Sequence, residues 1–219
     1  MNIAFVGFGT VGENVAARLQ RHKLGLNLRT VAIVDSTGAA ICHDGLDLET
    51  AIEVKKKFNS ISEWHPYGQS DITTLDVLEQ VDIDLLIETT TTDIIDGEPG
   101  LSNITSALSK GIDVITTNKG PIALALYQLK EIAERSGSRL RYSGTVGGGT
   151  PILDFAKHQL KNEKILSVKG VLNSTSNYIL WKMAKDKVKE YVRVETPKIS
   201  SETRSRLEKI ISSISVSAQ

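Results

Sequence analysis

Short apolar segments rich in β-branched residues alternate with amphipathic segments over the first 140 residues of the chain. Candidate strands lie at residues 3–6, 30–34, 83–88, 113–117 and 139–143. Apolar residues recur every three or four positions, as is typical of helices, over residues 13–23, 47–58, 101–111 and 123–137. Alternating strands and helices predict a parallel sheet covered by helices on both faces. Sheets of this kind bind ligands at the carboxyl ends of their strands.

The pattern changes near residue 139. The segments RLRYSGTV (139–146) and KILSVKGVLN (164–173) are typical of strands, and they flank a helix that we expect to begin after Pro151. A further helix is expected near Ser176. Residues 185–219 are charged and then serine-rich, and residues 200–214 have the pattern of one amphipathic helix. We therefore predict an α/β chain with a first domain over residues 1–140 and a smaller α+β domain over residues 141–219.

Composition limits the classes of function. No apolar stretch of the 219 residues approaches the length of a membrane span. Lys plus Arg and Asp plus Glu each total 26, so a net charge of zero predicts no general attraction to nucleic acid or anionic lipid. Small molecules or further copies of this chain are the expected partners.

The single cysteine and the N-terminus bear on the compartment. Cys42 has no second cysteine to pair with inside the chain, which fits a reducing cytoplasm. The opening MNIAFVGFG has no basic stretch before its apolar residues. We therefore expect it to form the first strand and not a signal peptide.

A glycine-rich loop follows the first candidate strand. It reads Gly7, Phe8, Gly9, Thr10, Val11 and Gly12, and a predicted helix comes directly after it. Glycines at this spacing allow a tight turn, a close approach of backbone to a pyrophosphate and tight packing of helix on strand. The position between a first strand and a first helix favours a Rossmann-type dinucleotide-binding domain over an ordinary turn.

The end of the second strand bears on the choice between NAD and NADP. Asp35 follows Gly12 by 23 residues and is placed to accept hydrogen bonds from ribose hydroxyls, which would favour NAD. Asp35 would equally suit the start of a turn. The run Lys55, Lys56 and Lys57 offers cations for a 2′-phosphate, which would favour NADP, although at least two of these lysines are expected to face solvent. The preference stays open.

Polar residues follow the third and fourth predicted strands. The segment after residue 88 is Thr89-Thr90-Thr91-Thr92, whose hydroxyls and amides are candidates to contact a cofactor's ribose and nicotinamide. Lys119 follows the next strand, after Asn118 and before Gly120-Pro121, which we expect to form a turn. A lysine beside a bound nicotinamide can exchange a proton with a substrate oxygen.

The ordered segments IAFVGFGTVG, VDSTGA, IETTTT, ALSKGIDVITTNKGPIA, YSGTVGGGTPI and VKGVLNSTSNYIL resemble homoserine dehydrogenase over residues 1–183. Members of this family interconvert aspartate 4-semialdehyde and homoserine with NAD(P)H, on the route to threonine, methionine and isoleucine. The resemblance implies an NAD(P)-binding Rossmann domain, a catalytic and dimerisation domain, and a homodimer.

The resemblance also assigns roles to single residues. Lys119 matches the family's lysine that contacts cofactor and substrate and is implicated in proton transfer, and Thr90 and Thr91 match residues beside the cofactor. The loop 143–150 matches one whose carbonyls bind a monovalent cation, Na⁺, in some members. That correspondence places ligands at Ser143, Val146, Gly148 and Thr150, although the family usually has Glu-Ala where Ser143-Gly144 stand. A hinge or close chain packing is the alternative explanation of this glycine run.

The sequence departs from the family after Met183. The family's GYAE-DP segment and G-x-D-x-x-x-K helix, which supply acidic groups for the substrate ammonium and a second catalytic lysine, have no counterpart there. Glu190, Glu195 and Lys198 are present but at no matching spacing. Two hypotheses follow: a truncated or divergent homoserine dehydrogenase, or a non-catalytic nucleotide-binding or oligomerising relative.

Overall fold

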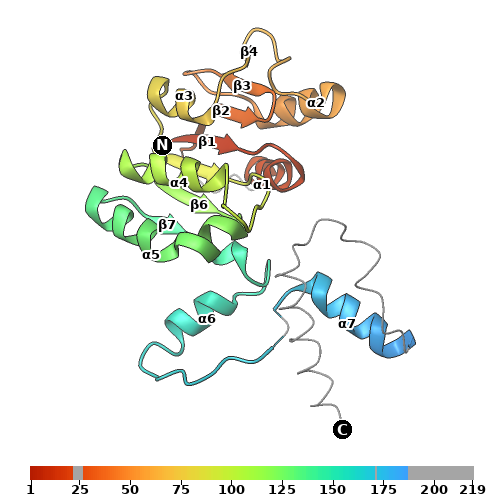
Figure 1. Ribbon diagram of the computed structural model, residues 1–219. Coiled ribbons are helices and arrows are strands. Elements are labelled where there is room, and N and C mark those ends of the chain that lie inside the picture. The colour runs from red at the N-terminus through yellow and green to blue at the C-terminus, as the bar shows by residue number, and fades with distance from the viewer. Residues whose placement is uncertain (22–26, 171, 187–219) are drawn as a thin grey trace. The chain divides into compact units, whose positions relative to one another are not determined.

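The computed structural model describes residues 1–21, 27–170 and 172–186 (Figure 1). The expected helix over 200–214, and Glu190, Glu195 and Lys198, lie outside the described residues. Contacts divide the chain into two compact units, residues 1–164 and 165–219. The domain boundary proposed near residue 140 stays a prediction.

A seven-stranded sheet forms the centre of the first unit, with strand order β4-β3-β2-β1-β5-β6-β7. The strands are β1 (Asn2–Val6), β2 (Arg29–Asp35), β3 (Gly38–Ile41), β4 (Gly68–Ser70), β5 (Leu85–Glu88), β6 (Asp113–Thr116) and β7 (Leu140–Arg141). The five strands β2, β1, β5, β6 and β7 are parallel, as the sequence predicted. The edge strands β3 and β4 run antiparallel and were not predicted.

Register places the ends of the central strands side by side. Val6 at the end of β1 is opposite Val34 of β2 on one side and Glu88 of β5 on the other. Glu88 is in turn opposite Thr116 of β6. The loops that leave these strands therefore start from one edge of the sheet, where parallel sheets bind their ligands.

Helices cover the sheet and continue beyond it. They are α1 (Thr10–Arg21), α2 (Leu48–Phe58), α3 (Thr74–Gln80), α4 (Gly100–Ser109), α5 (Lys119–Ser136) and α6 (Ile152–His158) in the first unit, with a 3₁₀ turn η1 (Ser143–Thr145), and α7 (Ser174–Asp186) in the second. Helix α3 was not predicted because seven residues are too few for a clear periodicity. Its start is set by a capping box between Thr73 and Asp76.

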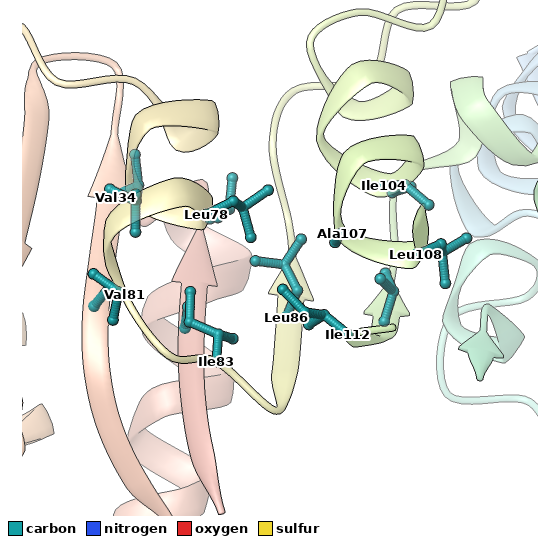
Figure 2. Packing of buried hydrophobic residues seen from close by; sticks show 14 of the residues in the cluster. Val34, Leu78, Val81, Ile83, Leu86, Ile104, Ala107, Leu108 and Ile112 are labelled. Atoms are coloured by element: carbon teal, nitrogen blue, oxygen red, sulfur yellow. The ribbon is translucent and has the colours of Figure 1, made fainter. Parts of the chain in front are cut away.

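Alternate residues of the strands enter two separate cores. Ile3 and Phe5 of β1 are buried with Ala16 of α1 and Ala51 of α2, whereas Ala4 and Val6 are buried in the other cluster. Figure 2 shows that second cluster, where Leu78, Leu86, Ile104 and Leu108 pack between sheet and helices. A strand that is apolar on both faces needs cover on both faces, and the predicted two-sided arrangement is confirmed.

Helix α5 begins earlier than the sequence suggested. Asn118 is its N-cap and Lys119 its first residue, so Gly120 and Pro121 lie in the first helical turn and not in a separate turn. Proline is tolerated there because the first amides of a helix have no intrahelical acceptor. The helix is interrupted at Ala125, where φ is −137° and ψ is 24°.

The predictions for residues after 139 are met in part. Helix α6 begins after Pro151 and α7 begins close to Ser176, whose amide donates to Asn173 Oδ1 at 2.9 Å. The predicted strand over 164–173 is wrong: residues 164–170 and 172–173 form no strand and are exposed. A strand needs neighbouring strands to pair its amides and carbonyls. Among the described helices, none is both long and apolar enough to cross a bilayer.

Candidate active site

A cavity of about 1050 Å³ opens at the carboxyl ends of β1, β2 and β5. Among the described residues, its lining consists of 6–11, 34–38, Lys55, 71–75, 89–92, Glu98, Pro99, Ser102 and Asn103. Most of the predicted cofactor residues are part of it, and Gly12 and Lys119 are not; those in the lining are Gly7, Phe8, Gly9, Thr10, Val11, Asp35, Thr90 and Thr91. Loops distant in sequence thus meet at the sheet edge that the strand pattern indicated.

The three glycines of the loop are required, or tolerated, for different structural reasons. Gly7 has φ of +85°, and a Cβ there would lie 2.5 Å from Thr90 N. A Cβ on Gly12 would lie 2.5 Å from Gly7 O, so the glycine at position 12 lets the first turn of α1 pack closely against the start of the loop. A Cβ on Gly9 would meet nothing within 4 Å. Gly9 is therefore the position where a side chain would occupy cavity space without disturbing the fold.

Hydrogen bonds join the glycine loop, residues 7–12, to the threonine loop, residues 89–92. Thr89 Oγ1 donates to Gly7 O at 2.6 Å, across 82 residues of sequence. Phe8 is buried and meets the ring of Phe5 edge-on, with centroids 5.8 Å apart. These contacts fix the glycine loop from both sides, so its backbone is preorganised before any ligand arrives.

Asp35 is saturated with protein donors. Its Oδ1 accepts from the amide and hydroxyl of Thr37, and its Oδ2 accepts from Lys55 Nζ at 2.7 Å and from Ile61 N at 2.9 Å. Burial alone would raise the pKa of Asp35, but the hydrogen bonds from Lys55, Thr37 and Ile61 outweigh it and hold the pKa below its usual 3.8. A carboxylate has about four acceptor sites, so ribose hydroxyls would compete with existing partners.

The lysine run divides between the cavity and solvent. Lys55 lines the cavity with its side chain 12% exposed, whereas Lys56 and Lys57 are exposed. Lys55 Nζ also donates to Asn59 O at 2.9 Å. An ammonium has three donors, so two are used by the protein and one remains for a ligand.

Lys119 lies beside the cavity at the threonine loop. It is exposed, and its backbone amide donates to Thr92 Oγ1 at 3.4 Å. Thr92 lines the cavity, while the Lys119 side chain does not. Asn118 fixes the start of α5 by accepting from Gly120 N at 3.2 Å. The lysine therefore stands at the rim, next to residues that we associated with the nicotinamide end.

The sequence interpretation missed a buried carboxylate at the centre of this edge. Glu88 ends β5 and is fully buried. It accepts hydrogen bonds from Thr90, Thr116 and Asn118. The available signal was an acidic residue at the end of an apolar strand, the same signal that drew attention to Asp35.

The candidate cation ligands lie in the loop from η1 to α6. The carbonyl of Ser143 accepts from Val146 N at 3.5 Å, and that of Thr150 accepts from Ile152 N at 2.8 Å. Gly148 has φ of +57°, and Gly147 before it has φ of +73°. A carbonyl oxygen has two lone pairs, so these bonds leave acceptor capacity at both residues. Cation binding by Ser143, Val146, Gly148 and Thr150 stays a prediction.

Comparison with family models gives two matches. Residues 1–116 match the model of Glutamate/Leucine/Phenylalanine/Valine dehydrogenase, and residues 151–198 match that of Homoserine dehydrogenase. The second match extends past residue 183, where the motif resemblance ended.

Individual relatives span both matched segments. The chain is 41% identical over 191 residues to a homoserine dehydrogenase of Methanocaldococcus jannaschii, covering 85% of this chain and 56% of the relative. It is 35% identical to an NAD(+)-dependent homoserine dehydrogenase of Pseudomonas canavaninivorans, covering 83% and 53%. A hyperthermophilic archaeal homoserine dehydrogenase mutant, solved in complex with NADPH, has a TM-score of 0.76 and 28% identity, with coverage of 85% and 57%.

The extent of these matches defines what they show. The chain spans little more than half the length of the curated relatives above. Within that span, the motifs and the fold agree with the same family. The first model matches residues 1–116, the part that contains the glycine loop and the residues after β5. Taken over both matched segments, the chain belongs to the homoserine dehydrogenase family.

Proposed function

We propose that this chain binds a nicotinamide dinucleotide and takes part in the interconversion of aspartate 4-semialdehyde and homoserine. The observation that carries the proposal is the position of Lys119 at the start of α5, with its amide on Thr92 at the rim of the cavity. A cation at the rim of a dinucleotide-sized cavity is where proton transfer to a substrate oxygen is needed.

The residues divide the work by position. The backbone of residues 7–12 and the N-terminus of α1 would bind the pyrophosphate, because helix amides and dipole favour an anion there. Asp35 and Lys55 form the adenosine ribose corner. Thr90 and Thr91 line the cavity after β5, on the other side of β1 from Asp35, and would face the nicotinamide. A bound nicotinamide supplies or accepts the hydride.

Lys119 has a role for each direction of the reaction. During aldehyde reduction, its ammonium would stabilise negative charge developing on the substrate oxygen and then donate a proton. During homoserine oxidation, the neutral amine would accept the hydroxyl proton. The exposed position of Lys119 leaves its side chain free to turn towards a bound substrate.

The choice between NAD and NADP depends on Asp35 and Lys55. One relative is named NAD(+)-dependent and another was solved with NADPH. Asp35 favours NAD only where a ribose hydroxyl displaces one of its present donors, whereas the remaining Lys55 donor suits a 2′-phosphate. Binding of both cofactors is therefore part of the proposal.

The wider assignment rests on family membership. It includes a homodimer, an NAD(P)-binding domain over residues 1–140 followed by a catalytic and dimerisation domain, and a monovalent cation on the carbonyls of Ser143, Val146, Gly148 and Thr150. The single Cys42 supports a cytoplasmic location.

Nucleotide binding without turnover is the second candidate. The lining of the cavity among the described residues ends at Asn103, so it does not draw on the segment where the family keeps its acidic substrate groups. Dinucleotide binding can therefore persist in a chain that does not process substrate.

The test is an assay of the purified chain for homoserine-dependent reduction of NAD and NADP, with calorimetric titration of both cofactors. Turnover would support the dehydrogenase. Binding without turnover would favour the second candidate. A parent protein that binds neither cofactor would contradict both.

A further inference from the structure

We propose that Glu88 is a positioning residue, whose carboxyl group ties the threonine loop after β5 to the start of α5 and so sets the position of Lys119. The inference deepens the proposed function and rests on its assignment of this end of the cavity to the nicotinamide. Glu88 does not line the cavity itself. It would act through Thr90 and Asn118.

Glu88 is held at the junction of two adjacent parallel strands. Its Oε2 accepts from Thr116 Oγ1 on β6 at 2.6 Å. Its Oε1 accepts from Thr90 N at 2.9 Å, from the Thr90 hydroxyl, and at 3.5 Å from Asn118 Nδ2. The side chain is 0% exposed, so these bonds replace water entirely.

The two threonine hydroxyls that donate to Glu88 also accept hydrogen bonds from Asn118. Thr116 Oγ1 accepts from Asn118 N at 3.0 Å, and Thr90 Oγ1 accepts from Asn118 Nδ2 at 3.1 Å. Both hydroxyls therefore point their own protons at Glu88, and Thr90 N adds a third. Both oxygens of Glu88 thus accept from protein donors, and the carboxylate is the shared acceptor of this network.

Asn118 carries the effect to the lysine. Its Nδ2 donates to Thr91 O at 3.2 Å, and its Oδ1 caps α5 through Gly120 N. Lys119 is the residue between these two contacts and donates its own amide to Thr92. The backbone of Gly120 packs directly against Asp93, and a Cβ at this position would lie 1.8 Å from Asp93 O. The backbone position of Lys119 is thus fixed by the network that Glu88 anchors.

The decisive variant is Glu88→Gln, which keeps the shape and turns one acceptor into a donor. One threonine hydroxyl would then face an NH₂ group, and the orientation of the loop would relax. We compare two ligands: 2′-phospho-ADP-ribose (ADP-ribose below), which is NADPH without the nicotinamide, and NADPH itself. We expect NADPH affinity to fall roughly tenfold, the equivalent of one lost hydrogen bond to a charged group, with ADP-ribose affinity within about twofold of the parent.

A measurement without ligand accompanies the titrations. Amide exchange at Thr90 and Gly120 should accelerate in Glu88→Gln. Exchange at Ile87 in β5 and at Val114 in β6, the two strands that Glu88 connects, should stay unchanged. Thr116→Val provides a second variant should Glu88→Gln fail to fold, because it keeps the volume and removes only the hydroxyl that donates to Glu88 and accepts from Asn118 N. It should give the same ligand contrast at roughly threefold. Asp113→Asn, an acid at the opposite end of β6, is the matched control and should change neither affinity.

The outcomes separate this inference from the proposed function. Equal loss of both ligands would mean that Glu88 supports the fold in general, and unchanged binding and exchange would mean that it positions nothing; either result overturns the inference. A parent that binds NADPH without turnover leaves the binding contrast fully measurable. A parent that binds neither ligand overturns the dinucleotide site and this inference together.

Discussion

Lys55 Nζ lies 2.7 Å from Asp35 Oδ2, and this ion pair lines the cavity, at the corner proposed for the adenosine ribose, with side-chain exposures of 12% and 4%. The pair spans 20 residues, from the end of β2 to the last turn of α2. Lys55 neutralises the buried carboxylate of Asp35 and occupies its Oδ2, an acceptor that a ribose hydroxyl would use.

Removal of the Lys55 charge should destabilise the fold. In Lys55→Met, Asp35 keeps its bonds from Thr37 and Ile61 but loses its cation, so we expect a loss of roughly 2–4 kcal/mol in the free energy of unfolding. Lys56→Met, one position along the same helix and exposed, should change it by less than about 0.5 kcal/mol. Urea denaturation of both variants measures the difference, and equal effects would show that the pair contributes nothing.

The same carboxylate should make stability depend on pH in a defined direction. The pKa of Asp35 is held below 3.8 in the folded protein, so its stabilisation is present above the unfolded value and disappears as pH falls through the folded value. The difference in unfolding free energy between the parent and Asp35→Asn should therefore be constant near neutrality and shrink on acidification. Asp76 and Asp113, whose pKa values are also lowered, contribute to both proteins and cancel. A difference that grows in acid would reverse the assignment.

Two glycines should separate ligand binding from folding. Gly9→Val places its side chain in open cavity space, so we expect cofactor affinity to fall at least about a hundredfold with little change in stability. Gly12→Ala puts a methyl group against Gly7 O and should cost about 1–3 kcal/mol of stability. Calorimetric titration and thermal unfolding of each variant test the contrast. Full cofactor binding by Gly9→Val would exclude the phosphate-loop role.

Lys119 should affect rate more than affinity. Lys119→Ala and Lys119→Met remove the ammonium, and any turnover should drop by about a hundredfold or more, as for other positioned acids and bases. Both variants should fold, because the side chain is exposed. Lys110→Met, at the C-cap of α4, serves as the control and should leave the rate unchanged.

The measurement is the maximal rate at saturating cofactor. A contact role alone would weaken cofactor binding in both Lys119 variants and leave that rate intact. Such a result would end the catalytic assignment.

The sequence predicted the features whose cause is local. The glycine loop was identifiable because its three glycines, the strand before it and the helix after it are contiguous. The two-sided cover of the sheet followed from β1, whose residues are apolar at every position from Ile3 to Val6. The start of α6 followed from Pro151.

The remainder depends on contacts between distant segments. Strands β3 and β4 are short, and β4 is the polar segment Gly-Gln-Ser, so pairing and not pattern makes them strands. The partners of Glu88 on β6 and at the N-cap of α5 lie 28 and 30 residues away. For Asp35 the sequence left open a ribose contact or the start of a turn, and its bond from Lys55 could not be predicted because that partner lies 20 residues away.

The interruption of α5 at Ala125 has a mechanical consequence. An uninterrupted helix of 18 residues is a rigid lever about 27 Å long, and a tilt at its far end would swing Lys119. The interruption divides α5 into a short arm, residues 119–124, and a long arm, residues 126–136. Asn118 and Thr92 hold the short arm, and Leu129 and Ala133 anchor the long arm in the core. We infer that motion of the long arm is absorbed at Ala125 and does not reach the lysine. Separate amide-exchange rates for residues 120–124 and 126–136 would be the signature of this isolation, and a single shared rate would contradict it.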